Sequence, residues 1–226
     1  MTPRICASIL PKNNAEALAL VKKAQKLKAD LIEVRLDCFE MPQNLAVLAK
    51  TAKIPLIATN KLTGEKGFFA GTEAERQQTL LNAAENGFQY VDVDLSSPNH
   101  KETIDELKKL GAKPIVSHHK LDCPLSFPEM EMVLKEEIAC DASVCKIVGA
   151  AETVEDNLAV LNFVASHSDK VKLVCFCMGE AGRVSRVLSP LFGAFFTFAS
   201  LENGSETAKG QISISEMKNA YSILGA

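Results

Sequence analysis

The sequence has no excess of basic residues and no long apolar segment. Its 226 residues include 25 Lys and Arg against 28 Asp and Glu, which gives a formal net charge of -3. Because a nucleic-acid-binding domain normally carries a basic face, a small-molecule partner is favoured over DNA or RNA. A membrane-spanning helix needs about 20 consecutive apolar residues, and no segment comes near that length. We therefore expect a cytoplasmic protein without a membrane partner.

Cysteine occurs seven times, but not in a pattern that predicts disulfides or a zinc site. An odd number of cysteines spread through apolar runs predicts reduced thiols, most of them buried as small core residues. Cys175 and Cys177 stand two apart in a strand-like run, so their side chains share a face. A structural zinc site would need a second pair, which the sequence lacks. We expect no structural metal.

Eight short runs typical of β-strands alternate with helical patterns. They read ICASIL, LIEVRLD, PLIATN, YVDVDL, KPIVSHH, VCKIVG, VKLVCFC and AFFTFAS. Strict alternation predicts parallel strands with right-handed crossovers. About eight such units without a linker predict an α/β fold, a single (β/α)8 TIM barrel over residues 1–226. An open doubly wound sheet is the alternative, although the glycine-rich dinucleotide motif is missing after ICASIL.

The run LIEVRLDCF places charged residues where a barrel strand is normally apolar. Alternate residues of a barrel strand face the interior, so Ile32, Val34 and Leu36 are expected to face the helices. The remaining positions then put three ionisable side chains inside the barrel, those of Glu33, Arg35 and Asp37. A parallel strand usually reads as continuous Val, Ile and Leu, so interior charges indicate a functional site. The alternative is a half-solvated edge strand.

A lysine stands in the middle of the apolar run VCKIVGA. By the same alternation, Lys146 faces the barrel interior, as do Asp92 and Asp94 of YVDVDL. A lysine is rarely buried without a partner, and loss of water favours its neutral form, which is a nucleophile. We therefore expect a neutral, reactive amine at Lys146. The alternative is a structural ion pair with one of the carboxylates.

Two histidines end the strand that precedes the lysine strand. His118 and His119 would lie on the C-terminal rim, where barrel active sites are built, and histidine titrates near neutral pH. Adjacent residues of a strand point to opposite sides, so we expect only one of them to face the pocket. A metal site that also recruits Asp122 and Cys123 is the alternative, but adjacent histidines do not easily chelate one ion from an extended strand.

Three loops carry further polar residues at strand ends. TNKLTGEKGFFAG contains Lys61 and Glu65 and has the composition of a rim loop. In MGEAGRVSRVLSP, Arg186 lies near a helix start, where a carboxylate or phosphate could bind, or it is a solvated surface arginine. SLENGSETAKGQISISEM is typical of a flexible lid, with Thr207 and Gln211 just before the last helix, although a disordered linker has the same composition.

Taken together, these segments resemble the type I 3-dehydroquinate dehydratase family. EVRLD, SHH, CKIVG, SRVLSPLFGAFFTFAS and AKGQIS occur in the order and spacing of that family, over nearly the whole chain. The resemblance implies a cytoplasmic, homodimeric (β/α)8 lyase of the shikimate pathway that uses no metal or coenzyme. Its implied reaction is the syn elimination of water from 3-dehydroquinate through a lysine Schiff base. A related Schiff-base aldolase, a metal-dependent hydrolase and a noncatalytic binding module are the rival functions.

The resemblance also implies a role for particular residues. Lys146 matches the Schiff-base lysine, and His119, two residues after the serine of its strand, matches the acid/base histidine. The matching substrate contacts are Ser8, Glu33, Arg35, Lys61, Glu65, Arg186, Thr207 and Gln211. Lys61 stands where the family commonly has arginine, and a lysine lacks the bidentate fork of a guanidinium. Thr207 replaces the usual serine, and Lys120 replaces an aspartate often seen after the histidine.

Overall fold

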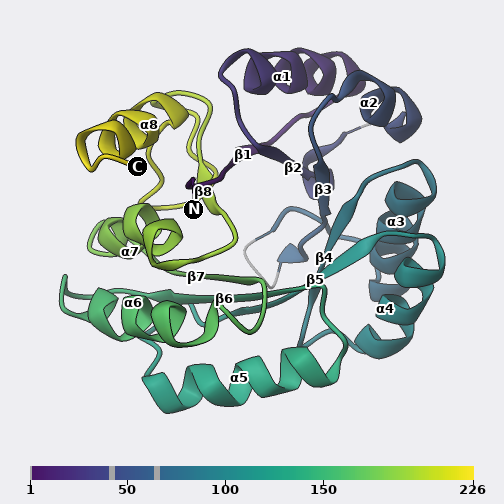
Figure 1. The fold of residues 1–226 in the computed structure, drawn as a ribbon. Helices are drawn as coiled ribbons and strands as arrows, with labels where there is room; N and C mark the ends of the chain where they lie inside the picture. The colour runs from purple at the N-terminus through teal and green to yellow at the C-terminus, as the bar shows by residue number, and fades with distance from the viewer. Residues whose placement is uncertain (1, 41–43, 64–66) are drawn as a thin grey trace.

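The computed structural model describes residues 2–40, 44–63 and 67–226. Within these ranges, eight parallel strands pair in the order β7-β6-β5-β4-β3-β2-β1-β8 and curve into a nearly closed barrel (Figure 1). The strands are β1 (Ile5–Ile9), β2 (Leu31–Arg35), β3 (Leu56–Thr59), β4 (Tyr90–Asp94), β5 (Lys113–His119), β6 (Val144–Ala150), β7 (Leu173–Met178) and β8 (Thr197–Ala199). Because β8 pairs with β1, the (β/α)8 prediction is confirmed and the doubly wound alternative is wrong.

Helices surround the barrel on its outer side (Figure 1). They are α1 (Asn14–Lys26), α2 (Leu45–Thr51), α3 (Glu73–Glu85), α4 (His100–Lys109), α5 (Phe127–Ala139), α6 (Asp156–His167), α7 (Arg183–Leu188) and α8 (Ile214–Ile223). Local sequence fixes several of their starts: Ser126 and Ser213 each form a capping box with the glutamate three residues later. Such a cap contributes about 1 kcal/mol. None of the helices in the described ranges is long and apolar enough to cross a bilayer.

The interior of the barrel is divided into an apolar lower layer and a polar upper layer. Near the start of the strands, the inward side chains form a hydrophobic cluster that includes Leu31, Ile57, Tyr90, Ile115 and Val144. Two residues further along the same strands, the inward positions are polar: Glu33, Thr59, Asp92, Ser117 and Lys146. The apolar layer closes the floor of the barrel, so polar chemistry is confined to the C-terminal end.

The strand β2 ends earlier than its sequence predicts. Ile32 and Val34 pack in the outer core, as expected, but the chain turns after Arg35 into the short 3-10 helix η1 (Leu36–Cys38). Asp37 therefore does not continue the inward row of the strand. Its carboxylate instead accepts hydrogen bonds from Arg35 Nε at 2.8 Å and from the Phe68 backbone N–H at 3.0 Å. The turn places Asp37 against the arginine two residues earlier, so its carboxylate fixes the Arg35 side chain.

Aromatic side chains close the seam between β7 and β8. In the described ranges these two strands share no ladder, although the backbone N–H of Phe195 donates to Leu173 O at 2.7 Å. At the C-terminal side of the seam, the rings of Phe176 and Phe198 meet edge to face with centroids 6.0 Å apart. Packing between large rings substitutes here for backbone pairing.

Candidate active site

A cavity of about 750 Å³ opens at the C-terminal ends of the strands. Eight of the ten residues predicted for the site line it: Glu33, Arg35, Lys61, His119, Lys146, Arg186, Thr207 and Gln211. Ser8 is buried beneath this surface, and Glu65 lies outside the described residues. Residues from six strands or their following loops therefore converge on one space, as the fold requires of a barrel site.

Lys146 lies in the upper polar layer as half of an ion pair. Its Nζ is 2.7 Å from Asp92 Oδ2 and 4.8 Å from the ring centroid of Phe198, and its side chain is only 6% exposed. The ion pair that the sequence left as the alternative is thus present. The paired ammonium still borders the cavity, so it can react once its proton has left.

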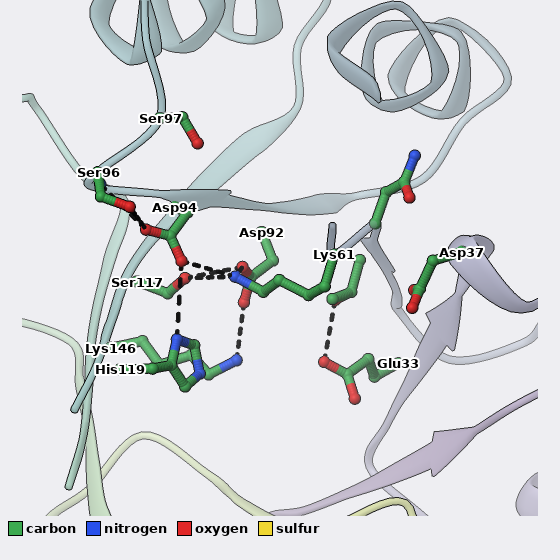
Figure 2. Close-up of polar contacts among 12 residues, drawn as sticks. Glu33, Asp37, Lys61, Asp92, Asp94, Ser96, Ser97, Ser117, His119 and Lys146 are labelled. Atoms are coloured by element: carbon green, nitrogen blue, oxygen red, sulfur yellow. Dashed lines mark hydrogen bonds and ion pairs between the residues drawn. The ribbon is translucent and has the colours of Figure 1, made fainter. Parts of the chain in front are cut away.

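A second lysine shares the same carboxylate. Lys61 Nζ lies 2.9 Å from Asp92 Oδ1 and 3.2 Å from Asp94 Oδ2, and it donates to Ser117 Oγ at 3.1 Å (Figure 2). Burial alone would raise the pKa of Asp92, but the ammonium groups of Lys146 and Lys61 hold it well below its usual range. Asp92 is therefore a carboxylate with one cation on each oxygen.

His119 lies beside this cluster and faces the other aspartate. Its Nδ1 is 3.9 Å from Asp94 Oδ2, and Ser96 fixes that carboxylate through its backbone N–H and its hydroxyl (Figure 2). Burial, followed by the Lys61 ammonium, lowers the pKa of His119 to about 4. The imidazole is thus neutral at neutral pH and can accept a proton. His118 is also among the residues that line the cavity.

The opposite wall carries a carboxylate held by hydroxyl groups. Thr59 Oγ1 donates to Glu33 Oε1 at 2.9 Å, and Ser8 Oγ donates to Glu33 Oε2. Ser8 is 1% exposed, is the register partner of Glu33 on β1, and does not line the cavity. Beside it, Arg35 is fixed by Asp37 through both Nε and Nη2. These two side chains present an acceptor and a donor in fixed positions, which suits recognition of hydroxyl groups.

Arg186 is the most unusual charge of the site because it is buried without a counter-charge from any described residue. The residue is 1% exposed, and its Nε and Nη2 make no hydrogen bond within the described part of the chain. Its guanidinium stacks 4.3 Å from the ring centroid of Phe176. Burial lowers the pKa of Arg186 to about 10, which still leaves it charged at neutral pH. A buried guanidinium with two nitrogen atoms that make no hydrogen bond can bind a carboxylate.

The segment from Thr207 to Gln211, the covering segment, precedes α8 and lines the same cavity as Arg186. The backbone N–H of Thr207 donates to Gln211 Oε1 at 2.8 Å, and Gln211 Nε2 donates to Thr207 Oγ1 at 2.9 Å. Between them, Gly210 has φ +78°, and a Cβ there would lie 2.0 Å from the carbonyl oxygen of Gly179. The lid predicted from composition is thus an ordered turn that contacts the β7–α7 loop.

The sequence alone did not identify some residues that shape this site. Phe176 and Phe198 look like ordinary strand residues, yet each supports a cation of the site. The close approach of Gly210 to Gly179 depends on two loops that are distant in sequence. The metal alternative is not assembled: within the described ranges, no three His, Cys, Asp or Glu residues are grouped as metal ligands.

Comparisons with known proteins agree with this geometry. The family model for Type I 3-dehydroquinase matches residues 5–226. A 3-dehydroquinate dehydratase of Dehalococcoides mccartyi is 36% identical over 219 residues, which cover 97% of this chain and 95% of that protein. A second, from Desulfotalea psychrophila, is 30% identical over 221 residues, 96% of each chain.

Solved structures show the same architecture. The crystal structure of a 3-dehydroquinate dehydratase from Geobacillus kaustophilus superposes with a TM-score of 0.92 at 23% identity, covering 100% of this chain and 92% of that one. The enzyme of that name from Enterococcus faecalis gives 0.82 at 26% identity, with 98% and 93% covered. From the family match over nearly its full length and from its relatives, the chain belongs to the type I 3-dehydroquinase family.

Proposed function

We propose that this chain is a 3-dehydroquinate dehydratase, a hydro-lyase that converts 3-dehydroquinate into 3-dehydroshikimate in the shikimate pathway. Family membership supports the activity. One structural observation carries the proposal: three groups line one cavity. They are the buried amine of Lys146, the neutral imidazole of His119 and the guanidinium of Arg186, which is unpaired among the described residues. Such a set can hold a carboxylate at one end and attack a ketone at the other.

The reaction begins at Lys146. Its amine gives up a proton, attacks the ketone carbon and, after loss of water, forms a protonated imine. The positive nitrogen then withdraws electrons from the neighbouring carbon–hydrogen bond. Asp92 stays at the nitrogen as a counter-charge, 2.7 Å away in the resting state. The step therefore changes no net charge at the buried nitrogen, which limits its electrostatic cost.

His119 transfers the proton of the carbon–hydrogen bond next to the imine to the leaving hydroxyl. As a neutral imidazole it removes the proton next to the imine, and the electron pair left behind forms the carbon–carbon double bond as the hydroxyl leaves. The imidazolium returns its proton to that hydroxyl, which departs as water. Because one group serves both transfers from one face, the elimination is syn. Hydrolysis of the imine then releases 3-dehydroshikimate and restores the amine.

The remaining predicted contacts hold the substrate at its two ends. Arg186, with Thr207 and Gln211 from the covering turn, would bind the carboxylate. Glu33 and Arg35 would bind the hydroxyl groups on the opposite side, where Ser8 and Thr59 keep Glu33 in place. Lid closure over the arginine end would exclude water from the imine. No metal or coenzyme is needed for any of these steps.

Reduction of the imine tests the proposal directly. Borohydride added with 3-dehydroquinate is expected to leave a stable adduct on the peptide that contains Lys146, detected by mass spectrometry. Lys61, the second lysine of the cavity, is the internal control, because it should remain unmodified. Full turnover without an adduct, or an adduct on Lys61 alone, would contradict the proposal. Failure with 3-dehydroquinate but trapping with another hydroxy-keto acid would favour the aldolase alternative.

We further propose that residues 1–226 form a single domain and that the chain is a cytoplasmic homodimer. One barrel sheet involves both ends of the chain, since β8 pairs with β1. The seven cysteines are free thiols, which suits a reducing compartment.

Two exposed apolar residues, Leu158 on α6 and Phe192 at the end of η3 (Ser189–Phe192), lie on neighbouring elements and could be covered by a second copy. Light scattering of the wild type and of Leu158→Glu tests the dimer, which the variant should weaken.

A further inference from the structure

Lys61 uses its hydrogen-bonding capacity within the protein. An ammonium group has three N–H donors. Three acceptors surround Lys61 Nζ: Asp92 Oδ1 at 2.9 Å, Asp94 Oδ2 at 3.2 Å and Ser117 Oγ at 3.1 Å. The side chain is only 9% exposed. A lysine engaged in this way has no donor left for a substrate hydroxyl, although that is the role its position implies by resemblance.

The three acceptors connect Lys61 to both reacting groups of the site. Asp92 binds Lys61 through Oδ1 and Lys146 through Oδ2. Asp94 Oδ2 faces both Lys61 and His119 Nδ1 (Figure 2). Ser117 accepts from Lys61 and donates to Asp92 Oδ1 at 2.8 Å, which closes the network. Of these six residues, Lys61 is the one that contacts both aspartates and the serine.

We propose that Lys61 is a positioning residue for the reaction, which holds Asp92 toward Lys146 and Asp94 toward His119, and is not a substrate-binding residue. This proposal rests on the proposed function, because it assigns Lys61 a task for the groups that carry out that reaction. Asp92 and Asp94 are successive inward residues of β4, and without a cation between them their charges would repel. Lys61 neutralises that repulsion and fixes both carboxylates.

The charge of Lys61 also sets the protonation of the cluster. With His119 neutral, two carboxylates balance the two ammonium groups of Lys61 and Lys146. Removing the Lys61 charge leaves a net negative cluster, which would make His119 easier to protonate. Beyond this cluster, the charged groups that line the same cavity are Glu33, Arg35, Asp122, Arg186 and Lys209. They are unchanged by a substitution at Lys61, so they form a constant background.

The test is a titration of His119 in the ligand-free protein, followed by nuclear magnetic resonance. The His119 signal is assigned by its loss in His119→Gln, and its midpoint in the wild type is expected at about 4. In Lys61→Met the midpoint should rise by about one unit or more, whereas Lys61→Arg, which keeps the charge, should stay within about half a unit of the wild type. Unchanged midpoints in Lys61→Met would overturn the proposal.

Kinetics with 3-dehydroquinate separate positioning from substrate binding. Lys61→Met should lower kcat by about tenfold or more and change KM by less than about threefold, with partial rescue in Lys61→Arg. A large rise in KM at unchanged kcat would instead identify a substrate contact and overturn the proposal. Ser117→Ala, which removes one Lys61 acceptor, should shift the His119 midpoint in the same direction by a smaller amount if Lys61→Met does not fold. Because the titration needs no substrate, it succeeds or fails independently of the proposed reaction.

Discussion

Phe176 and Phe198 meet edge to face at 61°, and each ring supports one cation of the site. The guanidinium of Arg186 lies 4.3 Å from the Phe176 centroid, and Lys146 Nζ lies 4.8 Å from that of Phe198. The ring pair thereby links the positions of Arg186 and Lys146, the proposed carboxylate receptor and nucleophile. A cation over an aromatic face gains about 0.5–2 kcal/mol, which offsets part of the cost of burying these charges.

The ring contact leaves Nε and Nη2 of Arg186 without hydrogen-bond partners in the described residues. We therefore predict that replacing Arg186 lowers activity but raises stability. Arg186→Met should lower kcat/KM by about 100-fold or more, because a charged hydrogen-bond pair to the substrate carboxylate is lost. The same change should raise the free energy of unfolding of the ligand-free protein by about 1–3 kcal/mol, since a buried unpaired charge disappears. Steady-state kinetics and urea unfolding measure the two effects.

Arg183 provides the matched control on the same helix. It is exposed and pairs with Glu180 at 2.7 Å, so Arg183→Met should change neither quantity appreciably. Arg186→Lys should recover little activity, because an ammonium group cannot make a bidentate pair. A stable, inactive Arg186→Met therefore supports a carboxylate receptor, whereas a destabilised variant with normal kcat/KM would contradict it.

The second prediction concerns the acidic limb of the pH profile. If His119 is the base, as we propose, its pKa of about 4 means that the base form persists well below neutral pH. We expect kcat/KM to be flat from neutral pH down to about pH 5 and to fall tenfold per unit well below the His119 pKa. Short assays from stopped-flow mixing avoid acid unfolding, which Asp92 and Asp94 would promote as their charges are lost.

Asp94→Asn is expected to shift the acidic limb of the kcat/KM profile to lower pH. Asp94 raises the pKa of His119 against the lowering effects of burial and Lys61, so its neutralisation should shift the acidic limb to lower pH. The loss of orientation should also reduce kcat by about tenfold. A limb that moves to higher pH in this variant would show that another group controls the profile.

The third prediction concerns Glu137, a buried carboxyl group on α5 behind the lysine strand. The residue is 0% exposed, and its oxygens make no hydrogen bond within the described residues. Burial raises its pKa well above the usual value. The folded protein therefore keeps this proton while the unfolded chain releases it above about pH 4.5, so the contribution to stability falls as pH rises from there toward the folded pKa.

Replacing this carboxyl group should remove the pH-dependent penalty. Glu137→Met should raise the free energy of unfolding by about 1–3 kcal/mol near pH 8 and by less near pH 5. Its neighbour Glu136 is exposed, so Glu136→Met is the control and should show neither effect. Urea unfolding at both pH values measures the difference, and an equal effect at the two would exclude deprotonation as its cause.

The sequence predicts the barrel because alternation is a local property. Strand residues such as Ile32 and Val34 face the helices as their parity requires, and the same parity correctly places Lys146 and Asp92 inside. It fails at Asp37, where the chain leaves the strand for a turn in which Asp37 binds Arg35 and the Phe68 backbone N–H. Parity holds as long as the strand does, and strand ends depend on tertiary contacts.

Alternation along a strand does not predict which site residues are charged or which of their hydrogen-bond donors are already used within the protein. The sequence suggests a neutral amine at Lys146, but the charge of Asp92 depends on which cations the barrel brings to each of its oxygens. The role of Lys61 likewise depends on Ser117, which is 56 residues away in the chain. Such networks are assembled from several strands, so no single segment carries their pattern.

The fourth prediction compares Gly210 of the covering segment with Gly204, which precedes that segment. Gly210 and Gly204 both have positive φ, +78° and +86°, so a side chain strains the backbone equally at each. Only at Gly210 would a Cβ also collide with a neighbour, 2.0 Å from the Gly179 carbonyl oxygen; at Gly204 nothing lies within 4 Å. Gly210→Ala should therefore displace the turn that carries Thr207 and Gln211.

If that turn holds the substrate carboxylate, Gly210→Ala should lower kcat/KM by about tenfold or more, because misplaced contacts no longer orient the substrate. Gly204→Ala should destabilise the protein by about 1 kcal/mol from its backbone strain and leave kcat/KM near the wild-type value. Kinetics and thermal unfolding of both variants separate strain from displacement. Equal activity in the two alanine variants would mean that the contact between Gly210 and Gly179 does not position the covering segment for catalysis.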